Sequence, residues 1–507
     1  MLKDCLFRPL MDIAIIIFKV LVNEKKLMAA YTLSCDVLSQ LGETIPTTLY
    51  FNQSMKTIQT TLSLLESMSV EDLLELPEMD TRLTQCMNFY STALVITFFL
   101  HPDMVPIIAC KMVQLTIESG ICHRSITGFV SLAVVLCWNI LPEKDIENAM
   151  RIGKAAMSCL LQRYKKSALL NHSFLSYYGH VAFHFEPFQL CCKKLQQSLD
   201  ALMLHGDVFM AGFYMCQYMK LAFPAGGQLP TLLQKVDSFL ESAETYKLDI
   251  VKPFLANFRC TIVTLMGSGD LLEQYDLPTK LYTEATYVHA AIKAFWQGYT
   301  ERCQHFIDKF LVLHKSSSSA GNLMVISISF IHGLTTFQLM KKNFSVRLRT
   351  TALEVIKVLK HLRKFSRWNF QNKVRYCKQG WLFFIFYTLH LKNISHCSPL
   401  AIPISQVELL EAELKSHEGK HNEAKVCYLA SISSAQKSGF IHEQGLACEF
   451  AGIHCRNTGD NSSARNFFDQ AKLCYTEWGS QIKVDSITRQ LDLLQCQSTG
   501  MNSPLDD

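Results

Sequence analysis

The 507-residue sequence is poor in glycine and proline, with 22 and 14 residues, and in charged residues, which make up 18%. Long stretches without glycine or proline favour helices over a turn-rich β architecture. Apolar residues account for 49%, which excludes a disordered chain. The length exceeds what one hydrophobic core supports, so several domains or a repeat array are expected. The sequence predicts an all-α protein.

The sequence also lacks a cluster of basic residues and a membrane-spanning run. Its formal net charge of +5 is spread along the chain, so we expect no nucleic-acid partner. The most apolar internal stretch, Ile126 to Leu141, is shorter than the roughly 20 residues that a transmembrane helix needs, and it contains Ser131 and Asn139. We expect no membrane span, and we interpret this stretch as a buried helix.

No pair of cysteines has C-x-x-C spacing, and the total of 19 is odd. Most cysteines lie among apolar residues at helical spacing, as Cys110, Cys137 and Cys216 do, which is typical of reduced thiols that act as small core residues. Secreted disulfide frameworks are short and loop-rich instead. The pattern favours a reducing, cytoplasmic location.

Catalytic motifs are missing as well. No G-x-x-x-x-G-K-[ST] phosphate loop, H-R-D or D-F-G kinase motif, or histidine-kinase phosphoacceptor helix is found. His180 and His184 have the spacing of one helical face, but a zinc site needs a third ligand, and Val181 stands where a metalloprotease has glutamate. We therefore expect no catalytic residue, cofactor or metal.

Three remaining clusters favour ordinary structural roles. Gly226-Gly227 and Gly267-Ser268-Gly269 follow no strand and precede no Lys-Ser/Thr, so they predict loops. The stretch Lys360–Lys378 interleaves basic and aromatic residues. It fits either contact with an acidic partner or a solvated helix face with buried aromatics, and we favour the second interpretation.

The clearest positive signal is a repeat near the C-terminus. The segment Glu408–Gly439 matches Cys448–Gly479 at an offset of 40 residues, with small, aromatic and glycine positions recurring. Glycine is favoured just past a helix end, and self-similarity at a fixed period is typical of a solenoid. The recurring pairs are Gly419 with Gly459, Ala424 with Ala464, Tyr428 with Phe468, and Gly439 with Gly479.

The second copy fits the tetratricopeptide pattern. Gly452 is the small residue of the first helix, Gly459 opens the turn, and the second helix carries the stripe Ala464, Phe468 and Ala471. We expect Gly452 and Ala464 to face each other between antiparallel helices, and Phe468 to fill the groove towards the next unit.

Turn residues extend this organisation upstream. Gly42, Gly120 and Gly206 each follow a predicted helix. We predict an α-solenoid of tetratricopeptide-like antiparallel helix pairs, in which each pair touches only its neighbours. Its parts are a helical array over 1–394 with long loops near 223–231 and 315–321, two repeats with a capping helix over 404–494, and a flexible tail over 495–507. Further helices are predicted at Glu24–Leu41, Asp145–Tyr164, Gln189–His205, Glu301–His314 and Val346–Phe365.

Several short stretches together resemble a known family. The chain resembles the tetratricopeptide-like helical region of large signalling proteins that combine a serine/threonine kinase-like domain, a P-loop ATPase, a GAF domain and a sensor histidine kinase. The matching stretches are Leu41–Glu43 with Pro46, Ser69–Met79, Lys111–Leu115, His184–Pro187, Gly206-Asp207, Gly439–Glu443 and Tyr475–Gly479.

The resemblance implies a regulatory scaffold without its own catalytic site, whose protein partners are kinase or ATPase modules. The family's Asn-x-x-x-Lys-x-x-Leu-x-x-Ala-Glu run is kept only in part, because Ile402 and Gln406 replace Asn and Lys while Leu409, Ala412 and Glu413 remain. Met1 falls inside the helical array, so we expect a truncated gene model, a fragment or a stand-alone derivative. Two alternatives stay open: a piece of a full-length ATP-dependent sensor kinase, and a stand-alone adaptor that binds a peptide.

Overall fold

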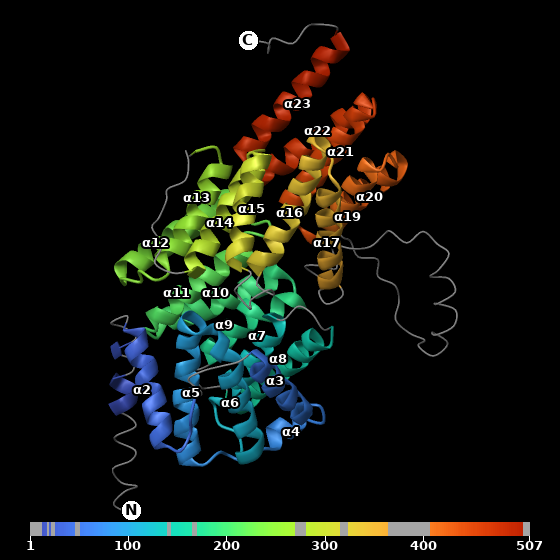
Figure 1. Cartoon of the computed structure of the whole chain (residues 1–507). Coiled ribbons are helices and arrows are strands. Elements are labelled where there is room, and N and C mark those ends of the chain that lie inside the picture. The colour runs from blue at the N-terminus through green and yellow to red at the C-terminus, as the bar shows by residue number, and fades with distance from the viewer. Residues whose placement is uncertain are drawn as a thin grey trace, which may run out of the picture. The chain divides into compact units, whose positions relative to one another are not determined.

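The computed structural model describes residues 13–17, 20–21, 26–45, 51–138, 143–164, 170–268, 280–314, 323–363 and 406–499. Within these ranges the chain is all-α (Figure 1), and its one extended pairing is an isolated bridge between Glu78 and Ile121. The prediction of an all-α protein is therefore confirmed. The described residues form two compact units, one up to residue 182 plus 193–217, the other comprising 183–192 and the residues from 218 onwards. The predicted boundary between 394 and 404 lies outside the described residues.

The first unit is built around helix α7, which is Ser125–Trp138. Every side chain from Ser125 to Cys137 is buried except that of Thr127, because α5, α6, α8 and α9 pack around the helix. The apolar stretch is thus a buried helix over its described part. No helix among the described residues is long and apolar enough to cross a membrane. The other helices of this unit are α2 (Leu27–Gln40), α3 (Phe51–Leu65), α4 (Val70–Glu75), α5 (Thr81–Leu100), η1 (Pro102–Met104), α6 (Val105–Ser119), α8 (Glu143–Arg163) and α9 (Leu170–His180).

Two helices, α10 (Phe188–Leu204) and α11 (Val208–Ala222), contribute residues to both units. Five upstream helix ranges were predicted from the sequence. The observed helices α2, α8, α10, α15 and α17 match these ranges to within a few residues. The predicted long loop near 223–231 is a turn, because α12 begins at Leu229. The predicted loop near 315–321 lies outside the described residues.

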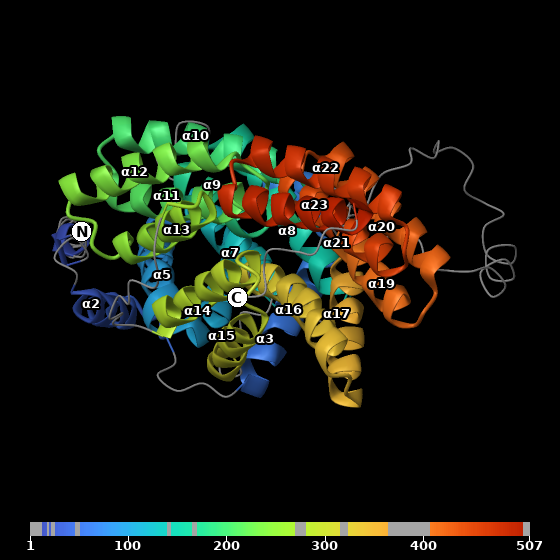
Figure 2. The same ribbon diagram turned by 90° about the horizontal axis from the view of Figure 1, so that it is seen from above.

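The second unit contains a row of helix pairs. In Figure 2 the pairs α14–α15, α16–α17, α19–α20 and α21–α22 follow one another. The first helices α14, α16 and α19 each pack against the second helix of their own pair and against the first helix of the next pair. The bounds are α12 (Leu229–Thr245), α13 (Lys252–Leu265), α14 (Lys280–Trp296), α15 (Thr300–His314), α16 (Leu323–Lys342), α17 (Val346–Arg363), α19 (Gln406–His417), α20 (His421–Ser438), α21 (Ile441–Asn457), α22 (Asn461–Trp478) and α23 (Gln481–Thr499).

The end of this row contacts helices α12 and α13, which precede the row in the chain. The hydroxyl of Ser480, just before α23, donates to the carbonyl of Leu265 at the end of α13, with 3.0 Å between the oxygen atoms. Gly479 ends α22 with φ +90°, and a Cβ atom there would lie 2.7 Å from Cδ of Pro230. The expectation that each pair touches only its neighbours is therefore wrong for the last pair. Helix α23 also extends to Thr499, into the predicted tail; residues 500–507 lie outside the described part.

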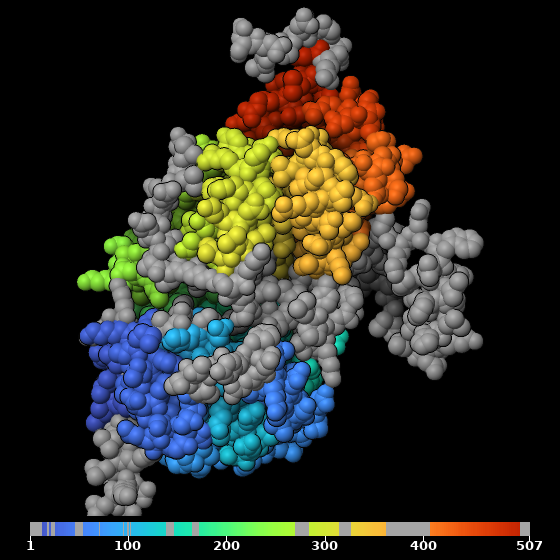
Figure 3. Space-filling view, viewed as in Figure 1, coloured from blue at the N-terminus to red at the C-terminus, as the bar shows by residue number. Residues whose placement is uncertain are grey.

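First and second helices differ in burial. All side chains from Gln406 to Glu413 of α19 are buried, and α21 is buried over most of its length. The second helices α20 and α22 instead present exposed side chains, including Val426 and Leu473. The space-filling view in Figure 3 shows the outer surfaces of α15 to α17 in yellow and gold.

The described cysteines are all free thiols, and most are buried. Burial raises the pKa of the Cys110 and Cys303 thiols to about 11, so the reactive thiolate is disfavoured at neutral pH. Cys5, Cys377 and Cys397 lie outside the described residues.

Candidate binding cavity in the second unit

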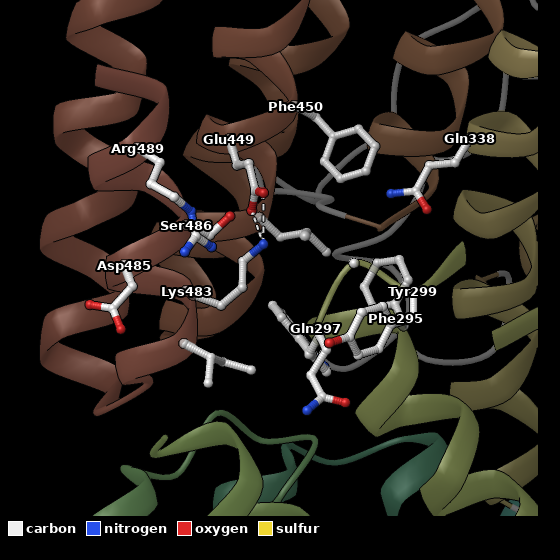
Figure 4. Close-up of a pocket in the computed structure, with 14 residues that line it drawn as sticks. Phe295, Gln297, Tyr299, Gln338, Glu449, Phe450, Lys483, Asp485, Ser486 and Arg489 are labelled. Atoms are coloured by element: carbon white, nitrogen blue, oxygen red, sulfur yellow. Dashed lines mark hydrogen bonds and ion pairs between the residues drawn. The ribbon is translucent and has the colours of Figure 1, made fainter. Parts of the chain in front are cut away.

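A cavity of about 300 Å³ lies within the second unit (Figure 4). One side is formed by the end of α14 with its following turn and by α16, the other by α21 and α23. Its lining residues are Phe295, Trp296, Gln297, Gly298, Tyr299, Gln338, Leu446, Glu449, Phe450, Ile482, Lys483, Asp485, Ser486 and Arg489.

A buried ion pair forms one wall of the cavity. Nζ of Lys483 lies 2.6 Å from each carboxylate oxygen of Glu449. The two residues are only 7% and 9% exposed. The hydroxyl of Tyr475 donates to Glu449 Oε2 at 2.6 Å, and burial, together with the Glu449 charge, raises the pKa of Tyr475 well above its usual value. These three side chains connect α21, α22 and α23.

Two glycines on α21 allow this wall to form. A Cβ atom at Gly445 would lie 2.8 Å from Cε1 of Tyr475, and one at Gly452 would lie 2.7 Å from the ring of Phe468. Both rings of α22 therefore pack directly on the α21 backbone. Glu449 lies one turn after Gly445 on α21, within reach of the Tyr475 hydroxyl.

The apolar part of the lining comes from Phe295, Trp296, Leu446 and Phe450, all buried. The Trp296 ring is 5.0 Å from the Trp478 ring and perpendicular to that of Tyr475 at 6.2 Å, measured between centroids. Aromatic pairs with such geometry add to the stability that area burial provides. The aromatic cluster therefore holds α14 against α22.

The polar rim includes hydrogen-bond donors that have no partner in the described part of the protein. Oε1 of Gln338 accepts a hydrogen bond from the Thr300 hydroxyl at 3.2 Å, so this amide offers its NH2 group to other partners. Arg489 is exposed and has no hydrogen bond or ion pair to any other described residue. Asp485, by contrast, already accepts from Gln481 at 2.7 Å.

The predicted repeat residues lie in α19 to α22 and in the turns that follow these helices. Gly419, Gly439, Gly459 and Gly479 follow these four helices with φ of +72°, +72°, +82° and +90°. The remaining predicted residues are buried: Ala424, Tyr428, Gly452, Ala464, Phe468 and Ala471.

One predicted contact differs from the observed one. The side chain nearest to Gly452 is Phe468, not Ala464. Phe468 therefore packs within its own helix pair, where the absence of a Cβ atom at Gly452 leaves room for the ring.

The weaker sequence clusters lie elsewhere. Helix α9 ends at His180, while His184 belongs to the 3₁₀ helix η2 (Ala182–His184), so the two histidines do not share a helix. Burial, with a smaller contribution from Lys220, lowers the pKa of His184 to about 3. No group of three or more potential metal ligands occurs among the described residues. Most of Lys360–Lys378 lies outside them.

Sequence analysis missed the residues that define the cavity: Glu449, Lys483, Trp296 and Arg489. One signal was available, because Glu449 is the only charged residue in the run Leu446–Ala451. A buried glutamate requires a partner, but its partner follows 34 residues later on a separate helix. No local pattern reveals such a pair.

The chain matches no protein-family model, and no similar curated protein is found.

Proposed function

We propose that the chain is a non-catalytic protein-interaction scaffold, an α-solenoid of tetratricopeptide-like antiparallel helix pairs whose last helix returns to the start of the row. The observation that carries this proposal is the cavity, which has binding groups but no reacting pair. Its lining includes no histidine or cysteine among the described residues, and its buried carboxylate and ammonium groups neutralise each other. Nucleophilic catalysis needs a base that is hydrogen-bonded to the nucleophile, and the Ser486 hydroxyl has no such bond to another described residue.

The packing of the helix pairs supports the repeat interpretation. Each of α14, α16 and α19 contacts its own second helix and the next first helix, which is the connectivity of stacked repeats. The pair α21–α22 has its closest approach at Gly452 and Gly445, where small residues permit it.

The second helices provide the surface for a partner. Val426 is 60% exposed and Leu473 is 71% exposed, on α20 and α22 respectively, and Leu429 lies one turn beyond Val426. Val426 and Leu429 are neighbours on the surface of α20, and exposed apolar side chains of this kind suit contact with another protein.

The resemblance to signalling proteins suggests the role of this scaffold. A stack of helices between an ATPase switch and an output kinase would transmit the state of one to the other, so kinase or ATPase modules are the proposed partners and the cytoplasm the proposed location. A part of a full-length ATP-dependent sensor kinase and a stand-alone peptide-binding adaptor remain the alternatives.

Photo-crosslinking tests the proposal. A benzoylphenylalanine at Leu473 in the full chain, expressed in its native cells, should give a discrete adduct with a kinase or ATPase, and the added substitution Val426→Glu should weaken that adduct. The matched control carries the probe at Arg465, also exposed on α22. An adduct with a protein lacking such domains would favour the adaptor alternative, and no adduct at Leu473 would contradict the scaffold.

A further inference from the structure

The two carboxylates of the cavity lining already accept hydrogen bonds from the protein. Both carboxylate oxygens of Glu449 are engaged by Lys483, and Tyr475 donates to one of them as well. Asp485 accepts from Gln481. Both carboxylates of the lining therefore have partners in the protein, Glu449 through both oxygens and Asp485 through one.

The donors are not satisfied in the same way. Arg489 has five N–H groups and no bonded partner among the described residues, and the NH2 group of Gln338 is left over because its carbonyl accepts from Thr300. Ser486 adds a hydroxyl on the turn of α23 between Lys483 and Arg489. Figure 4 shows the α23 side chains on one side of the cavity and Gln338 of α16 on the other. A complementary ligand must bring acceptor atoms.

The charge and the volume of the cavity limit the kinds of ligand that fit it. The four ionised lining residues, Glu449, Lys483, Asp485 and Arg489, carry no net charge together. A ligand with one negative charge, paired with Arg489, therefore leaves less uncompensated charge in the cavity than a ligand with two. The buried Trp296, Leu446 and Phe450 offer an apolar wall, and about 300 Å³ is at the lower end for small-ligand sites.

We propose that this cavity binds a carboxylate group carried on an apolar body of about one aromatic side chain. Arg489 pairs with the carboxylate, Gln338 and Ser486 donate further hydrogen bonds, and the apolar body lies against Trp296 and Phe450. The Glu449–Lys483 pair holds α23 in place. The ligand is either a small carboxylic acid or the C-terminal residue of a peptide. This inference rests on the proposed function in taking the cavity as a binding site.

Calorimetry with the full chain tests the proposal with five probes. These are 3-phenylpropionate, its amide 3-phenylpropanamide, phenylphosphonate, and acetyl-Ala-Ala-Phe with either a free or an amidated C-terminus. The free acids should bind, the amides should bind at least about tenfold more weakly, and Arg489→Gln should weaken the acids by a similar factor, because a charge-assisted hydrogen bond is lost. Arg465→Gln, which changes an exposed arginine of α22 away from the cavity, should leave binding unchanged.

The outcomes separate the alternatives. Binding of phenylpropionate alone identifies a small acid, whereas binding of the free tripeptide identifies a chain end. Equal binding of acid and amide, equal binding to the Arg489→Gln variant, preference for phenylphosphonate, or no binding at all would overturn the proposal. Unchanged melting temperatures show that the variants are folded. The adduct at Leu473 reports on the scaffold independently, so it can persist when carboxylate binding fails.

Discussion

Helices α7 and α21 are both buried over most of their length, but by different chemistry. Helix α7 has no charged residue, and its only polar side chains are hydroxyls such as those of Thr127 and Ser131. Helix α21 contains two buried glutamates, Glu443 and Glu449, and two glycines that accept rings of α22. One is a generic apolar core helix, the other a helix whose burial depends on particular partners.

The two helices differ in the kind of neighbouring side chains that they need in order to be buried. An apolar helix is stabilised by any well-packed apolar surroundings. A buried carboxylate is tolerated only where a cation or several donors meet it, as Lys483 and Tyr475 meet Glu449. We infer that α7 provides stability to the first unit, while α21 determines which helices pack together in the second.

The largest effect should follow from placing a charge in α7. Leu132 is fully buried, so Leu132→Glu would introduce a carboxylate among apolar side chains. The free energy of unfolding should fall by about 4 kcal/mol or more, or the first unit should fail to fold. Leu132→Met, which keeps the volume, should reduce it by less than about 1.5 kcal/mol in urea unfolding. Similar losses of unfolding free energy in both variants would contradict the inference that the stability of α7 depends on an apolar environment.

The complementary change in the second unit removes one partner of a buried pair. Lys483→Ala leaves Glu449 with the Tyr475 hydroxyl alone and should reduce the free energy of unfolding by about 3–5 kcal/mol. The double variant Glu449→Leu with Lys483→Met should recover most of that loss, because no charge remains to desolvate. Urea unfolding followed by tryptophan fluorescence measures both. A double variant as unstable as the single one would show that the ion pair itself, not the stranded charge, provides the stability.

Gly452→Leu should have a smaller effect in the same helix. A side chain there would overlap the Phe468 ring, and overpacking of this kind reduces stability by about 1–3 kcal/mol. Because Ser480 and Gly479 contact the ends of α13 and α12, hydrogen exchange should speed up in α12 and α13 as well as in α21 and α22. Ser462→Leu, at an exposed position of α22, is the control. Faster exchange confined to residues 406–499 would show that α12 and α13 do not depend on their contacts with Gly479 and Ser480.

The sequence predicted the features that depend on local chemistry. Low glycine and proline indicated an all-α chain, the apolar run after Ser125 indicated a buried helix, and Gly439 and Gly479 indicated helix ends. Features that join distant segments were not predictable. The contact between Ser480 and Leu265 spans 215 residues, and no periodicity within either helix encodes it. The cavity depends on several such contacts, so its residues were missed.

A buried histidine should make the second unit sensitive to acid. His289 of α14 is buried, with Nδ1 2.9 Å from the Thr261 hydroxyl, and burial, followed by the Lys293 charge, lowers its pKa to about 3. The unfolded chain binds this proton near pH 6.5, so stability is retained above that pH and falls below it, by up to about 1.4 kcal/mol per pH unit until about pH 3. His289→Gln should reduce the slope between pH 6.5 and 5, whereas His205→Gln, at an exposed position, should not. Equal slopes would place the acid sensitivity elsewhere.

The smallest effect is expected at Lys437, in the last turn of α20 and two residues beyond the fully buried Ala435. Lys437 is exposed, so Lys437→Ala removes no packing. It removes a favourable interaction of a cation with the helix C-terminus, worth a few tenths of a kcal/mol, and it introduces alanine, which has the higher helix propensity. These contributions oppose each other, so the free energy of unfolding should change by less than about 0.5 kcal/mol. Ala435→Leu, by contrast, should overpack the α19–α20 contact and reduce stability by about 1–3 kcal/mol. A larger loss at Lys437 than at Ala435 in parallel urea titrations would mean that the face of α20 assigned to solvent is covered.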